Sequence, residues 1–201
     1  MIKAQTILSE REEMILLSLR KLDFLTRDQL RKIHMLGEIR NTNRVLRGLS
    51  PYLSSFREEF TTVYYLNSLG REYVNSHKIR RKNCFVGHVL MRNDFYIFSG
   101  FPFEWRNEVK VSDDRFTIIC DTWFKKNGKY HFLEVDYMQK MKENREKIKR
   151  YIGLFENRAV KNHLGYFPKL IWLTATEFRR KQLMELCKAL PCEVYTIDDI
   201  R

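Results

Sequence analysis

The segment of residues 40–49 has two chemically different sides, and this feature constrains the fold of the first half of the chain most strongly. At about 3.6 residues per turn, one face of a helix carries three arginines: Arg40, Arg44 and Arg47. The opposite face carries three apolar residues: Val45, Leu46 and Leu49. A helix of this kind docks its apolar side on a core and leaves its guanidinium groups at the surface. We therefore predict a surface helix from about residue 41 to residue 49, closed by Ser50-Pro51.

Two capping boxes predict the helices that precede this segment. In the first, Ser9 stands three residues before Glu12; in the second, Thr26 stands three residues before Gln29. Each pair can satisfy backbone N–H groups at the start of a helix. Gly37 is expected to end the second helix in a left-handed conformation.

Two short runs after the basic segment predict a β-hairpin. Residues 52–56 and 61–66 are rich in aromatic and β-branched side chains, and residues 57–60 separate them as a four-residue tip. Another helix is expected from residue 70. Three helices followed by a hairpin predict a winged helix-turn-helix over residues 1–82, in which the third helix enters the major groove of DNA.

Arginine and asparagine side chains match the hydrogen-bonding edges of guanine and adenine in the major groove. The residues of the basic helix that we predict to contact DNA are Arg40, Asn41, Thr42, Asn43, Arg44 and Arg47. At the hairpin tip only Arg57 is expected to reach phosphate, because Glu58 and Glu59 would be repelled. Otherwise the hairpin stays clear of DNA or contacts a protein. A solvated surface helix without a ligand is the alternative interpretation.

A basic segment of residues 77–82 follows, and it shows no apolar periodicity. Its predicted DNA contacts are Arg80, Arg81 and Lys82. The segment either follows a phosphate backbone or serves as a solvated linker. We place the domain boundary after residue 82.

The chain carries a formal net charge of +12, and its pI is about 9.6. This charge favours a polyanionic partner such as double-stranded DNA, although only through non-specific attraction. The four cysteines form no CxxC pair, and no apolar run approaches the length needed to span a bilayer. We expect a cytoplasmic protein that has no membrane contact.

The second half alternates helical and strand-like segments. Helices are predicted over residues 85–98, 141–157 and 177–190, and strands over residues 105–111, 116–124, 130–137, 170–173 and 193–197. Asn127-Gly128 is a strong hairpin signal between the second and third strands. This order predicts an α/β domain over residues 83–201, in which helices cover a sheet.

Three carboxylates fall on two neighbouring strands of this domain: Asp121, Glu134 and Asp136. Residues two apart in a strand face the same way, and the hairpin brings Asp121 alongside the other two. Converging acids can hold Mg²⁺ and activate water, with Asp121 and Glu134 as the metal ligands. The alternative is structural: the acids pair with Lys147 or Arg150 on the following helix.

Six segments of the sequence carry a family resemblance: LTRDQL (25–30), NRVLRGL (43–49), VYYLNSLGR (63–71), WRNE (105–108), FLEVD (132–136) and EKIKRY (146–151). Together with Cys120-Asp121 they resemble the replication-relaxation family of bacterial plasmids, phages and mobile elements. The resemblance implies a winged helix fused to a PD-(D/E)xK nuclease-like domain, with a role in DNA replication or its control.

The resemblance also implies roles for the acids. Asp121 and Glu134 match the first and second acids of the nuclease motif. Asp136 stands where that motif has its lysine, and Cys120 stands where it has a proline. Lys140 or Lys142 could supply the missing ammonium group.

Three hypotheses follow for the function. In the first, the chain is a homodimeric, plasmid- or nucleoid-associated DNA-binding protein acting in replication or transcription regulation, and its nuclease-like half serves in assembly without catalysis and needs no cofactor. In the second, it is a Mg²⁺-dependent endonuclease or nickase that uses Asp121, Glu134 and Asp136. In the third, it is an adaptor that binds replication proteins.

Overall fold

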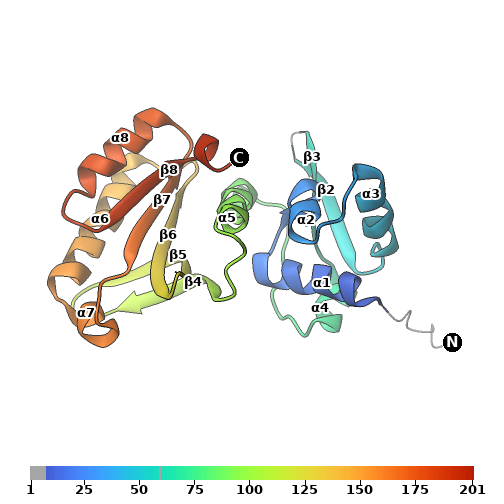
Figure 1. Ribbon diagram of the computed structural model, residues 1–201, viewed down its shortest axis with the longest axis horizontal. Helices are drawn as coiled ribbons and strands as arrows, with labels where there is room; N and C mark the ends of the chain where they lie inside the picture. The colour runs from blue at the N-terminus through green and yellow to red at the C-terminus, as the bar shows by residue number, and fades with distance from the viewer. Residues whose placement is uncertain (1–7, 59) are drawn as a thin grey trace. The chain divides into compact units, whose positions relative to one another are not determined.

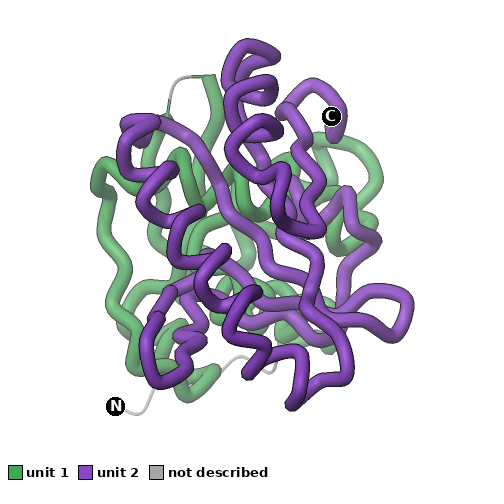
Figure 2. Tube along the Cα trace, turned by 90° about the vertical axis from the view of Figure 1, so that its left-hand side faces the viewer, with its two compact units in different colours: residues 1–93 green, residues 94–201 purple. Residues whose placement is uncertain are grey.

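The computed structural model describes residues 8–58 and 60–201. The chain forms two compact units, one ending at Asn93 and one running from Asp94 to Arg201 (Figure 2). The division falls within helix α5 (Val86–Phe98), so the basic segment of residues 77–82 lies in the first unit. Each unit has its own β-sheet, and the fold is mixed α+β.

The first unit runs in the order helix, short strand, two helices, hairpin, helix (Figure 1). Its elements are α1 (Glu10–Leu22), β1 (Leu25–Thr26), α2 (Arg27–Ile33), α3 (Ile39–Gly48), β2 (Leu53–Glu58), β3 (Thr61–Leu66) and α4 (Ser68–Tyr73). The strands form an antiparallel sheet in the order β1-β3-β2. The two-residue strand β1 was not predicted, because so short a run carries no periodicity.

Both predicted capping boxes are confirmed at the starts of α1 and α2. Gly37 takes the predicted left-handed conformation, with a φ of 68°, but the prediction that it ends α2 is wrong. The helix ends at Ile33, and Met35 then takes a positive φ of 49°, which breaks the helical run before Gly37 is reached.

The hairpin is confirmed, but its predicted four-residue tip is wrong. Arg57 pairs with Thr62 and Glu58 pairs with Thr61, so β2 continues two residues further toward the tip than predicted, while β3 begins at Thr61 as predicted. Glu59 lies outside the described residues.

The core of the first unit receives the apolar side of α3, where Leu46 and Leu49 are buried. A second cluster joins Phe24 and Val63 to Val86 at the start of α5. The first turns of α5 therefore complete the core of this unit.

The second unit contains a five-stranded sheet in the order β4-β5-β6-β7-β8. Its elements after α5 are β4 (Trp105–Ser112), β5 (Thr117–Lys126), β6 (Lys129–Asp136), α6 (Met141–Glu156), α7 (Ala159–Leu164), β7 (Lys169–Thr174), α8 (Glu177–Leu186), β8 (Cys192–Thr196) and a 3-10 turn (Ile197–Asp199). Strands β4, β5 and β6 are antiparallel neighbours, whereas β6, β7 and β8 run parallel. The predicted order is confirmed, except that α7 was not predicted and α8 ends four residues earlier than expected.

Helices cover both faces of this sheet. Ile148 and Tyr151 of α6 and Leu183 of α8 pack with Phe132 and Trp172 on one face. On the other face, Phe95 from the end of α5 contacts Phe124, with ring centroids 6.0 Å apart. The part of β6 from Phe132 to Asp136 is therefore buried on both sides, and a charged residue there needs a partner within the protein.

Candidate functional site

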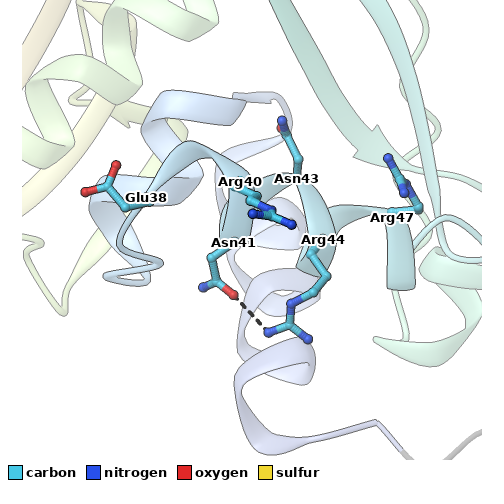
Figure 3. Close-up of a pocket in the computed structure, with 6 residues that line it drawn as sticks. All are labelled: Glu38, Arg40, Asn41, Asn43, Arg44 and Arg47. Atoms are coloured by element: carbon cyan, nitrogen blue, oxygen red, sulfur yellow. Dashed lines mark hydrogen bonds between the residues drawn. The ribbon is translucent and has the colours of Figure 1, made fainter.

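Helix α3 presents a basic face that surrounds a hollow of about 640 Å³ (Figure 3). The hollow is lined by Glu38, Arg40, Asn41, Asn43, Arg44 and Arg47. The side chains of Arg40, Asn43, Arg44 and Arg47 are exposed, while Asn41 is half-buried. We define these five residues, without Glu38, as the basic face of α3.

Asn41 differs from its neighbours because its side-chain amide is already bonded within the protein. Its Nδ2 donates to the carbonyl of Leu36 at 2.7 Å, and its Oδ1 accepts from Nη2 of Arg44 at 2.8 Å (Figure 3). Both ends of the amide are therefore used, and they fix the Arg44 guanidinium to the start of the helix.

Thr42 does not belong to the basic face. It is fully buried, and its hydroxyl donates to the carbonyl of Glu38 at 3.1 Å. The prediction that Thr42 contacts DNA is wrong, since one turn of helix places position 42 beside Leu46 on the core side.

The predicted contacts outside α3 have different environments. Arg57 and Arg81 are exposed. Lys82 pairs with Glu58 at 2.9 Å and also donates to the carbonyl of Arg57. Lys82 thus offsets the carboxylate that would repel phosphate at the hairpin.

Arg80 binds a buried aspartate that the sequence did not indicate. Its guanidinium contacts Asp23 through Nε at 3.0 Å and Nη2 at 2.8 Å. Asp23 also accepts from Arg92 of α5 at 3.1 Å, and Lys78 lies 3.8 Å away. Arg80 therefore ties the basic segment to the end of α1 within the first unit.

In the second unit, Asp121 and Glu134 meet at Lys147 of α6. Lys147 Nζ donates to Glu134 Oε2 and lies 3.9 Å from Asp121 Oδ1. Tyr151 donates its hydroxyl to Glu134 Oε1 at 2.6 Å. The backbone N–H of Val135 donates to Asp121 Oδ2 at 2.7 Å, in place of a continued strand ladder between β5 and β6.

The protonation of this cluster follows from its burial. Burial raises the pKa of Glu134 well above its ordinary value, and the neighbouring charge of Asp121 adds to the effect. Burial lowers the pKa of Lys147, but the negative charges of Glu134 and Asp121 outweigh it and leave that pKa raised. We conclude that the ammonium stays protonated and serves as the shared cation of the two acids.

Asp136 belongs to a separate network. It is fully buried, and it accepts hydrogen bonds from Nε and Nη2 of Arg179, both at 2.5 Å. Asn144 and Thr174 donate to it as well, each at 2.7 Å. All of its acceptor capacity is used within the fold, so it does not converge with Asp121 and Glu134 on one ion.

The residues present do not fit a divalent cation in this arrangement. Within the described residues, no three His, Cys, Asp or Glu side chains come together as a metal site. The Lys147 ammonium and the Tyr151 hydroxyl occupy the oxygens of Glu134 that a metal would need. The structure thus shows the structural pairing with Lys147, whereas Arg150 donates to the carbonyl of Glu146 within α6.

A family model described as replication-relaxation matches residues 16–170. The match covers α2, α3, the hairpin and the strands that carry Asp121 and Glu134. The chain belongs to the replication-relaxation family. The resemblance carried by the six sequence segments is thereby confirmed, and family membership connects the protein with replication in mobile elements.

No curated protein matches this replication-relaxation chain significantly. Among its described residues, no helix combines the length and the apolar character needed to cross a bilayer.

Sequence reasoning missed three partners in this replication-relaxation protein: Asp23, Asn144 and Arg179. Asp23 follows α1 with a positive φ of 72°, a conformation that a sequence pattern does not reveal. Asn144 and Arg179 lie on helices that were predicted, but no local sequence signal indicates that their side chains bind Asp136. Only the count of buried carboxylates on β6 could have suggested that such partners exist.

Proposed function

We propose that this replication-relaxation protein binds double-stranded DNA, with α3 as the recognition helix of a winged helix-turn-helix. The basic face of α3 is the observation that carries the proposal. It offers three guanidinium groups and two amide side chains around one hollow, with Glu38 as the only acid among the described lining residues. Arginine and asparagine are the side chains best suited to read guanine and adenine.

The order of elements supports this proposal. In the first unit, α1, β1, α2 and α3 precede a hairpin, and the three strands pair as β1-β3-β2. A short strand that joins a hairpin beside three helices is the arrangement expected of a winged helix, with α2 bracing α3. Arg57 and Arg81, which are both exposed near the hairpin, are the proposed phosphate contacts outside α3.

The contacts within the basic face suggest a division of roles. Asn41 is bonded at both ends and positions Arg44, whereas the side chains of Arg40, Asn43 and Arg47 form no hydrogen bond or ion pair among the described residues. These three side chains are the proposed readers of bases, together with the oriented Arg44. Asn41 acts through Arg44 rather than by touching DNA itself.

We propose that the second unit is a PD-(D/E)xK-like domain that serves in assembly and not in cleavage. Its strand and helix order agrees with that plan, but Lys147 and Arg179 neutralise the acids that catalysis would need. A homodimer would place two copies of α3 on paired half-sites, which raises the specificity that a single small module can reach. The protein would then act in the bacterial cytoplasm on plasmid, phage or mobile-element DNA, in replication or its control.

Selection of bound duplexes from a random pool tests this function. We expect enrichment of a short motif, and paired motifs at a constant spacing if the protein is a dimer. The variant with Arg44→Ala and Arg47→Ala should enrich no motif, whereas Arg115→Ala removes an exposed arginine of the second unit and should leave the motif unchanged. Equal recovery of all sequences by the unaltered protein would contradict base reading by α3.

A further inference from the structure

A recess of about 380 Å³ lies at the end of the second unit's sheet where strands β6, β7 and β8 begin. It is lined by three lysines, Lys126, Lys129 and Lys169, and by the rings of Tyr130, His131 and Tyr166, among others. None of the described lining residues carries a carboxylate. Its residues are distinct from those of the Lys147 cluster and from the basic face of α3.

A backbone hydrogen bond and a ring contact hold the rings of Tyr166 and His131 in place. Gly165 ends α7 with a φ of 80° and turns the chain so that Tyr166 follows in the recess wall. The Tyr166 hydroxyl accepts the backbone N–H of Tyr130 at 2.7 Å. The ring of His131 stacks on the ring of Phe124, with the centroids 5.1 Å apart. Burial lowers the pKa of His131, so at neutral pH this side chain adds an aromatic ring and no charge to the recess.

Two of the three ammonium groups remain available to an anion. Lys169 pairs with Glu193 at 2.5 Å. Lys126 and Lys129 have no carboxylate partner in the part of the chain that the structure describes. Lys129 Nζ lies 5.9 Å from the centre of the Tyr166 ring, and the exposed Lys126 has its Nζ 5.9 Å from the centre of the Phe98 ring. An uncompensated cation beside a half-exposed ring is suited to a ligand that joins a negative charge to a flat aromatic group.

We propose that this recess binds a nucleotide unit of single-stranded DNA, with phosphate at Lys126 and Lys129 and a base stacked on Tyr166. Cationic grooves lined with aromatic rings hold single strands in this way, since every base has a face that can stack. A duplex keeps its base faces covered by neighbouring bases and cannot use the ring. The recess would therefore hold a strand that is already unpaired, a contact that α3 does not provide.

Binding of a labelled oligothymidylate of about a dozen nucleotides, measured by fluorescence anisotropy, tests the assignment. The full chain with Arg44→Ala and Arg47→Ala is the parent, so that the basic face of α3 contributes little. Tyr166→Leu should weaken binding by roughly 5- to 100-fold. Tyr166→Phe keeps the ring but loses the hydroxyl that accepts the N–H of Tyr130, so it should weaken binding clearly less than Tyr166→Leu does.

The lysines provide a second measurement that does not depend on the packing of Tyr166. The double variant with Lys126→Ala and Lys129→Ala should weaken binding. The slope of the logarithm of the binding constant against the logarithm of the salt concentration should fall by an amount corresponding to about one to two phosphate contacts. Lys110→Ala, which removes an exposed lysine of β4, is the matched control and should change neither.

Three results would overturn the proposal. The first is unchanged binding in both the Tyr166→Leu and the double lysine variants. The second is competition by thymidine monophosphate as strong as that by the oligonucleotide, which would make a free nucleotide the ligand. The third is duplex binding in the recess that matches single-strand binding. These tests do not depend on the proposed function of α3, because the parent protein already lacks Arg44 and Arg47. A failure to select a duplex motif would therefore leave the single-strand measurements unaffected.

Discussion

The basic face of α3 and the Lys147 cluster both gather charged side chains, yet they differ in what those charges contact. On α3 the guanidinium groups of Arg40 and Arg47 reach solvent and form no ion pair among the described residues. Around Lys147, each charge is buried or half-buried and bonded to another part of the fold. Charge that is left unpaired at a surface is available to a ligand, whereas charge compensated inside a unit maintains the fold. Clusters of similar composition can therefore have opposite roles.

The largest effect is expected at Lys147. Lys147→Ala leaves Glu134 and Asp121 without their shared cation, so the free energy of unfolding should fall by on the order of 3 kcal/mol. Urea denaturation followed by circular dichroism measures the change. Lys147→Met combined with Glu134→Gln should recover most of the loss, because the buried charge goes together with its partner. A Lys147→Ala protein as stable as the parent would break the contrast between the two regions.

Substitutions on the basic face should affect binding and not stability. Arg44→Ala and Arg47→Ala are each expected to weaken binding to the selected duplex by about 1–3 kcal/mol. Their unfolding free energies should change by less than about 0.5 kcal/mol, since both side chains are exposed. Loss of affinity that is equal on every sequence would identify them as phosphate contacts instead.

The pH dependence of the free energy of unfolding should reveal the contribution of the buried Glu134 carboxyl group. Its folded-state pKa lies above the ordinary value of 4.5, so protonation favours the folded state. The stabilisation that Glu134 adds to the free energy of unfolding is fully present below its unfolded-state pKa. It is lost as the pH rises through the raised folded-state pKa. Glu134→Gln should remove this loss, so the stability of the variant should fall less than that of the parent as pH is raised from 4.5. Denaturant titrations across this range, with Glu185→Gln as an exposed control, compare the two slopes.

Asn41 should give a smaller effect that reveals its indirect role. Asn41→Ala frees the Arg44 guanidinium and is expected to weaken duplex binding by about 1 kcal/mol. In the double variant with Arg44→Ala, no further loss is expected, because Asn41 acts through Arg44. Additive losses in this double-mutant cycle would show that Asn41 contacts DNA directly.

The smallest effect is expected for cleavage. Supercoiled plasmid incubated with the protein and Mg²⁺ or Mn²⁺ should be nicked no faster than with Asp121→Ala or Glu134→Ala. Nicking that both substitutions abolish would restore the endonuclease hypothesis and show that Lys147 leaves Glu134 when a cation binds.

The sequence predicted most of the fold because its local signals are strong. The capping boxes at Ser9 and Thr26, the Asn127-Gly128 turn and the two-sided helix at residues 40–49 each specify an element through contacts a few residues apart. The hairpin tip and the end of α2 were wrong, since they depend on strand pairing and on a positive φ at Met35. These features have no short-range signature.

The candidate site was predictable only as far as periodicity reaches. The exposed arginines of α3 follow from the helical repeat, and so does the burial of Leu46. The repeat also places Thr42 with Leu46, a consequence that the prediction of DNA contacts overlooked. The choice of Lys147 over Arg150 as the partner of the acids depends on how α6 lies across the sheet, and the engagement of Asp136 by Arg179 joins residues 43 positions apart. Such pairings are set by tertiary packing rather than by local pattern.

The ion pairs of Asp23 have a practical consequence for anyone dissecting this protein. A fragment that stops at Lys82 would keep Arg80 but lose Arg92, and it would uncover Phe24 and Val63 where Val86 now packs. A fragment extended to Asn93 would also retain the amide of Asn93, which donates to the carbonyls of Leu22 and Phe24. Helix α5 thus contributes residues to both units, and a cut ahead of it would remove packing and hydrogen-bond partners from the core of the first unit.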